Sequence, residues 1–148
     1  MQTFIPWVHV FAFSIWLGAN LFVLGLWWPA GRGLPPGPRL EVLRRAAGGL
    51  NALVAAAAPV AVVSGLAGAF LHGTAQFAPG SGAFLVVAAK AVLTAVMGLN
   101  HGLQAFRYEV SLEHPLDGRN PWMRLLVVNV ALGVVVLLLG LSLRRLAL

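Results

Sequence analysis

One stretch decides the fold of this chain: AFLVVAAKAVLTAVMG, residues 83–98. Its apolar run is typical of a helix embedded in a membrane, and Lys90, the only lysine of the chain, lies in the middle of it. An ammonium group at bilayer depth costs at least about 2.5 kcal/mol, so a charged residue there indicates a functional site. Lys90 is therefore the first candidate functional residue. A lysine that extends its ammonium group to the membrane surface is the alternative.

The composition predicts an integral membrane protein. Of the 148 residues, 59% are hydrophobic and only 9% are charged, and the mean hydropathy is +0.87. Four stretches reach the ~20 residues that a membrane-spanning helix needs. They are residues 4–28, 42–72, 83–108 and 122–143. We therefore expect an all-α fold with a single domain, residues 1–148, in which four transmembrane helices form an antiparallel bundle.

Proline, glycine and polar residues interrupt the apolar stretches. Residues 29–38 hold so much proline and glycine that we expect this segment not to be helical, and residues 73–82 and 110–121 mark further breaks. The first helix lacks the basic start of a signal peptide, so we expect it to be retained. Because the chain has no cysteine, disulfides and thiolate metal sites are excluded.

Most arginines lie in or beside the first and third connections. By the positive-inside rule, residues 29–41 and 109–121 are expected in the cytoplasm and both termini outside an inner membrane, although Arg144 and Arg145 follow the last span. The net charge of +6 is expected to bind lipid head groups and not nucleic acid.

Small and aromatic residues predict how the helices pack and where they end. Gly98 and Gly102 form a GxxxG motif on the third span, which favours close helix packing. Gly65 with Gly68, and Gly133 with Gly140, would give smooth patches on the second and fourth spans. Tryptophans are expected to anchor helix ends at the membrane surface, namely Trp7, Trp27, Trp28 and Trp122.

Two polar layers are predicted from helical periodicity. Residues eleven positions apart lie on one line of an α-helix, roughly 16 Å apart along its axis. Lys90 and His101 form such a pair on the third span, and His9 and Asn20 form one on the first. If both spans run inward, His9 and Lys90 share an outer layer, which His72 approaches from the end of the second span. Asn20 and His101 then share an inner layer.

Each span contributes an asparagine to the inner half of the bundle. Buried amides in a membrane face the bundle interior and bond one another, so we expect interhelical hydrogen bonds that fix the register. The asparagines concerned are Asn20, Asn51, Asn100 and Asn129.

A histidine and a lysine at one depth can hold a haem. Imidazole is a common axial ligand of haem iron, and four-helix bundles carry such cofactors between their helices. His9 is expected to ligate the metal, with His72 or Lys90 as its partner. Lys90 could instead pair with a haem propionate or carry protons. His101 lies too far from His9 for the same iron, and is a separate inner feature or a ligand of a second haem. Trp16 could wall a porphyrin or serve packing alone.

These residues resemble the HemJ-type protoporphyrinogen oxidases and, more loosely, the CopD-like membrane proteins with the same four-span core. The first span is similar in its histidine followed by Ser-x-Trp-x-Gly, here His9 with Ser14-Ile-Trp16-Leu-Gly18. The second begins with a similar charged entry, Leu40-Glu-Val-Leu-Arg44-Arg45. On the third span, the spacing from Lys90 to His101-Gly102 matches the lysine-to-His-Gly spacing of the family. The family's Asn-Glu-x-Pro before the fourth span is shortened here to Asn120-Pro121.

The resemblance implies a membrane-embedded oxidoreductase with a b-type haem near His9 and Lys90. It would oxidise protoporphyrinogen IX to protoporphyrin IX, with Lys90 and His101 as the catalytic residues. A quinone or another acceptor of the respiratory chain would receive the electrons. The expected partners are thus the lipid bilayer, porphyrin or haem, and the electron acceptor, with a homo-oligomer left open.

Two other functions stay open at this point. A CopD-like protein would transport copper, but copper(I) pathways favour methionine and cysteine, and this chain has three methionines and no cysteine. A non-catalytic haem protein, which relays electrons as an accessory subunit, would use the same residues. The missing glutamate before Pro121 is the one feature that favours the relay over the enzyme.

Overall fold

The computed structural model describes residues 4–71, 80–112 and 120–146. Its helices follow one another as α1 (Phe4–Phe22), η1 (Val23–Trp27), α2 (Trp28–Arg32), α3 (Pro36–Leu71), α4 (Gly82–Leu112) and α5 (Pro121–Leu146). Four stretches of them are long and apolar enough to cross a membrane: Phe4–Gly31, Gly37–Leu71, Gly82–Arg107 and Pro121–Ser142. The predicted all-α four-helix membrane bundle is thereby confirmed, and the chain is a multi-pass membrane protein.

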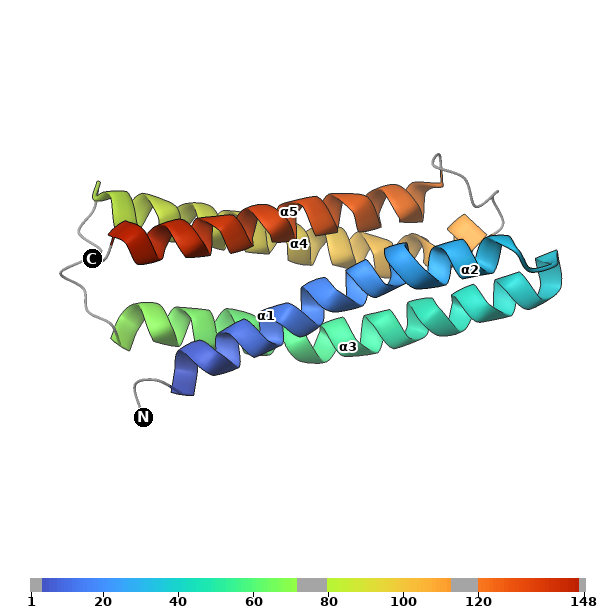
Figure 1. Cartoon of the computed structure of the whole chain (residues 1–148), viewed down its shortest axis with the longest axis horizontal. Coiled ribbons are helices and arrows are strands. Elements are labelled where there is room, and N and C mark those ends of the chain that lie inside the picture. The colour runs from blue at the N-terminus through green and yellow to red at the C-terminus, as the bar shows by residue number, and fades with distance from the viewer. Residues whose placement is uncertain (1–3, 72–79, 113–119, 147–148) are drawn as a thin grey trace.

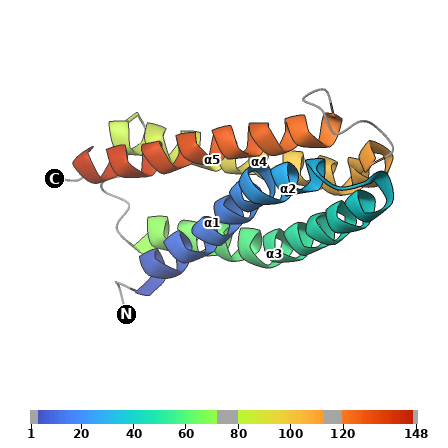
Figure 2. The same ribbon diagram turned by 45° about the vertical axis from the view of Figure 1, so that its right-hand side comes forward.

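The bundle consists of two helical hairpins, α1 with α3 and α4 with α5 (Figure 1). Across the hairpins α1 packs on α5 and α3 packs on α4, so α1 and α4 lie on a diagonal. Figures 1 and 2 both show that the hairpins diverge toward the end at which α1 starts, here named the terminal end. At the other end, named the opposite end, η1 packs on α5 and the hairpins lie closer together.

The first span contains a π-helical segment, η1, between α1 and α2. Pro29 has no backbone N–H and cannot donate the hydrogen bond that an α-helix would require of it. The N–H of Trp28 donates to the Val23 carbonyl, five residues back, so the helix passes this point with a wider turn. One consequence is that Trp28 is buried and only 5% exposed.

The expectation that residues 29–38 are not helical is wrong in extent. Only residues 33–35 lie outside the helices, because α2 continues to Arg32 and α3 already begins at Pro36. The first turn of a helix makes no use of its N–H groups, so Pro36 and Pro38 fit there without losing a hydrogen bond. Side-chain caps begin the later helices. The Ser81 hydroxyl accepts from the Phe84 N–H at 3.1 Å, and Asn120 Oδ1 accepts from the Trp122 N–H at 3.0 Å.

The tryptophan and GxxxG expectations need correction. Trp28 and Trp122 are buried inside the bundle, whereas Trp7 is 72% exposed, as expected of an anchor. Neither Gly98 nor Gly102 has a side chain or another helix within 4 Å of the position of a Cβ, so the GxxxG motif does not mediate packing among the described residues. Spacing alone does not say which face of a helix meets its neighbour.

The closest approach between hairpins occurs at Gly133 of α5. A Cβ on this residue would lie 2.7 Å from Leu17 Cδ1 of α1 and 3.4 Å from Met97 Cε of α4. Three helices therefore meet at one residue that has no side chain. This contact sets the relative heights of α1, α4 and α5.

The hydrophobic core fills the opposite half and thins toward the terminal end. In α4, no residue before Met97 is buried. The buried residues nearest the terminal end are Ala12 on α1, Ala61 and Ser64 on α3, and Val136 on α5. Beyond them the interior faces of the helices are only partly covered by protein.

Replacement of Gly133 by leucine tests the three-helix contact. The added side chain would displace both Leu17 and Met97, and overpacking of a filled core costs about 1–3 kcal/mol. Gly133→Leu should therefore lower the midpoint of thermal unfolding, followed by tryptophan fluorescence in lipid nanodiscs. Gly98→Leu is the control, because nothing lies within 4 Å of its Cβ position. Equal midpoints for the two variants would contradict the contact.

Candidate functional site

His9 is fixed by a hydrogen bond to the backbone of the neighbouring helix. Its Nδ1 lies 2.7 Å from the carbonyl oxygen of Ala61 on α3. Because a carbonyl oxygen only accepts, Nδ1 carries the proton and donates it, which leaves Nε2 as the unprotonated nitrogen. No hydrogen bond to Nε2 is found within the described ranges. An imidazole anchored in this way is the usual arrangement for a metal-ligating histidine.

Gly65 provides the space for the His9 ring. A Cβ at this position would lie 2.9 Å from His9 Cε1 and 3.0 Å from Nδ1. Any side chain there would push the imidazole away from Ala61. The Ser64 hydroxyl donates to the Val60 carbonyl of its own helix. Ser64 Oγ also lies 3.2 Å from the Ala61 carbonyl oxygen. The α3 backbone around Ala61 is thus shaped to hold one ring in one orientation.

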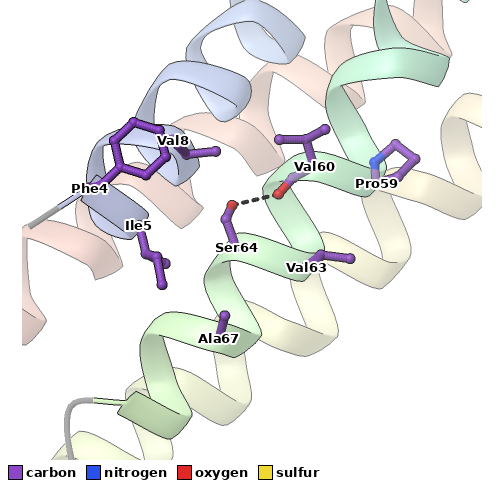
Figure 3. Close-up of a pocket in the computed structure, with 8 residues that line it drawn as sticks. All are labelled: Phe4, Ile5, Val8, Pro59, Val60, Val63, Ser64 and Ala67. Carbon is purple, nitrogen blue, oxygen red and sulfur yellow. Dashed lines mark hydrogen bonds between the residues drawn. The ribbon is translucent and has the colours of Figure 1, made fainter. Parts of the chain in front are cut away.

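A shallow groove of about 440 Å³ lies between α1 and α3 in the same half of the bundle (Figure 3). Apolar side chains such as Phe4 and Val63 line it, and its one polar residue is Ser64, whose hydroxyl bonds the Val60 carbonyl. His9 is not part of its lining. The groove offers no polar group for catalysis and is a packing surface for lipid or for an apolar chain.

Lys90 lies on α4 against α5, where Gly140 leaves room for it. A Cβ on Gly140 would be 3.3 Å from Lys90 Nζ. The side chain of Lys90 is half-buried, and its ammonium group lies within electrostatic range of the His9 imidazole. In the part of the chain that the structure describes, the one salt bridge joins Arg45 to Glu41, both exposed at the opposite end. Lys90 forms no ion pair with any residue of the described ranges.

Among the residues whose side chains the structure describes, none forms a salt bridge with Lys90. The chain has four acidic residues, and Glu41 lies near the start of α3, at the opposite end. The other three all follow the part of α4 that spans the membrane: Glu109, Glu113 and Asp117. The described side chains therefore leave the ammonium group of Lys90 without a counter-charge.

His9 and Lys90 lie at one height in the bundle. Leu17 of α1 contacts Gly133 of α5, and these helices are antiparallel. Eight residues before Leu17 is His9, and eight residues after Gly133 is Leu141, next to the Gly140 that contacts Lys90. The two residues therefore face each other across the diagonal of α1 and α4, one turn beyond the end of the hydrophobic core.

Of the other candidate residues, Trp16 and His101 lie apart from His9 and Lys90. His72 lies outside the described residues. Trp16 is 1% exposed and belongs to the core, where its ring meets Phe13 edge-on at 6.4 Å between centroids. His101 lies eleven residues beyond Lys90, roughly 16 Å further along α4, in the opposite half. The pair formed by His9 and Lys90 is thus separate from Trp16 and His101.

Polar side chains form a second group in the opposite half, the polar cluster, which consists of Trp16, Asn20, Asn100, His101, Gln104 and Asn129. The expected interhelical amide bond exists once, where Asn100 Nδ2 donates to Asn129 Oδ1 at 2.9 Å. Asn20 instead donates to the Trp16 carbonyl of its own helix at 2.8 Å, and Asn51 on α3 is only half-buried. The prediction that asparagines fix the register therefore holds for one pair.

Six buried atoms of the polar cluster have no hydrogen-bond partner within the described ranges. They are Trp16 Nε1, Asn20 Oδ1, His101 Nδ1, Gln104 Nε2, Gln104 Oε1 and Asn129 Nδ2. Each unsatisfied buried atom costs ~1–3 kcal/mol, so six of them together would cost about as much as the whole free energy of unfolding of a typical protein. Sequence reasoning missed Gln104, although its spacing of four from Asn100 indicates the same helix face.

The residues at the terminal end fit a haem better than a bare metal ion. No group of three or more His, Cys, Asp or Glu that could hold a metal ion exists in the described part of the chain. A haem brings its own four nitrogen ligands and needs only axial ligands such as His9 Nε2 from the protein. The buried Met97 and Met123 lie in the opposite half, away from His9, so they offer no copper(I) ligands beside it.

Substitution of Gly65 tests the anchoring of His9. In Gly65→Ala the new methyl group would displace the ring and break its bond to the Ala61 carbonyl, at a cost of ~0.5–1.5 kcal/mol. We expect the ¹⁵N chemical shifts of the His9 imidazole to move toward those of a ring that exchanges between tautomers. Gly48→Ala on the same helix is the control, since nothing lies within 4 Å of its Cβ position. Unchanged shifts in Gly65→Ala would contradict the anchoring.

Lys90 should lower the stability of the protein in the absence of a ligand. Lys90→Met removes a half-buried ammonium group without a counter-charge and keeps the length of the side chain. We expect it to raise the free energy of unfolding by about 1 kcal/mol, below the ~2.5–3.5 kcal/mol of a lysine at the centre of a membrane. Lys90→Arg keeps the charge and should not stabilise. A lower unfolding midpoint for Lys90→Met in nanodiscs would refute this expectation.

Comparisons with protein-family models, with curated proteins and with solved structures give no match to this chain. The function therefore has to be argued from the residues of the site.

Proposed function

We propose that this protein is a membrane-embedded, b-type haem-binding oxidoreductase that oxidises protoporphyrinogen IX to protoporphyrin IX, as the HemJ-type family it resembles does. One observation carries the proposal. The ammonium group of Lys90, without a salt bridge among the described residues, lies level with His9, whose Nε2 is the unprotonated ring nitrogen. A porphyrin would supply a partner for each residue. Its carboxylates would pair with the Lys90 ammonium group, and the iron of a haem would accept the His9 imidazole.

Each residue of the site has a distinct task in this proposal. His9 would be the axial ligand, held in orientation by the Ala61 carbonyl and the space above Gly65. Lys90 would bind a propionate and balance its charge, and it would keep the porphyrin carboxylate at membrane depth. When bound, haem would pass the six electrons that protoporphyrinogen IX loses on to the quinone or other respiratory-chain acceptor, which would also take up the six protons released. Toward the terminal end few residues of the four helices are buried, and a porphyrin bound by His9 and Lys90 would have to lie between the hairpins there.

The location of the site agrees with an inner-membrane enzyme. At the opposite end Arg44 and Arg45 are exposed on the first turns of α3, as expected for a cytoplasmic surface. With residues 29–41 and 109–121 in the cytoplasm, His9 and Lys90 would lie in the outer half of the membrane. A quinone or another acceptor of the respiratory chain could take the electrons there directly from the lipid phase.

An absorption spectrum of the purified protein tests haem binding. Protein from haem-replete cells should show a Soret band and, after reduction, sharp α and β bands. His9→Ala should lose most of this absorbance, because the iron loses its fixed ligand. His101→Ala is the matched control and should retain it, since His101 lies roughly 16 Å further along the bundle. A spectrum without a Soret band in the unmodified protein would exclude the proposal.

Complementation of a strain without protoporphyrinogen oxidase separates the enzyme from an electron relay. The unmodified chain should restore growth, and Lys90→Met should not, while Lys90→Arg should restore it in part. A protein that binds haem but never complements would be an accessory haem protein. Copper bound at a stoichiometry of one or more in place of haem would support the transport function instead.

A further inference from the structure

The polar cluster has hydrogen-bonding capacity that the protein leaves unfilled. After the bonds from Asn20 to the Trp16 carbonyl and from Asn100 to Asn129, six buried atoms on three helices remain without partners in the described ranges. Gln104 and Asn129 are fully buried, and Trp16 is nearly so. His101 and Gln104 lie close enough to interact, yet no pair of their atoms reaches hydrogen-bond geometry. Two neighbouring buried polar side chains without a direct bond can be bridged by a water molecule.

The chemistry of the six atoms defines what can satisfy them. Trp16 Nε1, Gln104 Nε2 and Asn129 Nδ2 are donors, Asn20 Oδ1 and Gln104 Oε1 are acceptors, and His101 Nδ1 can be either. An occupant that only accepts, such as a carboxylate, would leave the acceptors unpaired. A cation would leave the donors unpaired. Water both donates and accepts, and it carries no charge.

Two residues with unfilled atoms, Asn20 and Asn129, flank the three-helix contact at Gly133. Asn20 follows Leu17 by three residues, and Asn129 precedes Gly133 by four, so both lie one turn from the contact on the faces that meet there. Asn129 is bonded to Asn100, which shares a face of α4 with Gln104. The donor of Asn129 and the acceptor of Asn20 thus belong to one interface between α1 and α5 without a direct bond between them.

We propose that the polar cluster binds ordered water between α1, α4 and α5. A buried water makes about three hydrogen bonds, so the six atoms correspond to about two molecules. This water would connect Asn20 with Asn129 and Gln104 with His101, and it would hydrate the one histidine of the cluster inside the membrane-spanning bundle. The proposal does not depend on haem, because none of its bonds involve His9 or Lys90.

Hydroxyl-radical footprinting of the unmodified protein in nanodiscs detects such water. Radicals formed by radiolysis of bound water oxidise adjacent side chains even when these are inaccessible from outside. Trp16 and the buried Met97 beside Gly133 should therefore be oxidised within about tenfold of the rate of exposed Trp7 and, in ¹⁸O-labelled water, should incorporate the label. Oxidation of Trp7 with no modification of Trp16 or Met97 would overturn the proposal.

The sign of a stability change gives an independent test. If water bonds Gln104, then Gln104→Leu leaves the buried water without one of its hydrogen-bond partners. The substitution should therefore lower the unfolding midpoint by about 3 °C or more. It should also reduce oxidation of Met97. If the cluster is dry, the same substitution removes two unpartnered atoms and raises the midpoint, which would refute the proposal. Asn51→Leu, a half-buried asparagine outside the cluster, is the control and should change the midpoint little. Loss of haem absorbance in other variants bears on neither result.

Discussion

The contact of Leu17 and Met97 with Gly133 brings α1, α4 and α5 together at one residue and defines their relative heights there. Because Gly133 has no side chain, α5 approaches both α1 and α4, and Met97 fills the remaining space from the third helix. From this point, His9 comes level with Lys90 in one direction, and Asn20 approaches Asn129 in the other. A shift by one helical turn would separate both pairs. The site and the polar cluster therefore share one origin, although they lie in different halves.

Much of the fold could be predicted from the sequence, because apolar length and composition determine whether a helix can cross a membrane. The all-α membrane bundle follows from that alone, and so do the approximate spans. Apart from the helix ends within residues 29–38, the expectations that failed depended on rotation about a helix axis. The burial of Trp28 follows from the wider turn of η1, and the exposure of Gly98 and Gly102 follows from the face that α4 turns toward α5. Neither is encoded in residue spacing.

The candidate site could be predicted in its side chains but not in its backbone contacts. Helical periodicity alone named His9 and Lys90 as one layer. It gave no indication that the Ala61 carbonyl holds His9, because a carbonyl oxygen is present at every residue and leaves no trace in the sequence. Likewise, the four asparagines looked equivalent, yet only Asn100 and Asn129 reach each other across helices. Bond formation depends on fractions of an ångström, which the order of residues does not specify.

The π-helical segment between Val23 and Trp27 has a consequence for how this chain can evolve. A π turn holds one more residue than an α turn, so the segment absorbs an additional residue without altering the helix on either side. On one side His9, Trp16 and Asn20 keep their register, and on the other Trp28 stays inside the bundle. Between these two constraints, the first span can gain or lose a single residue in this segment alone. Homologous chains that differ in length by one residue in the first span would then be aligned correctly only with their gap at this turn.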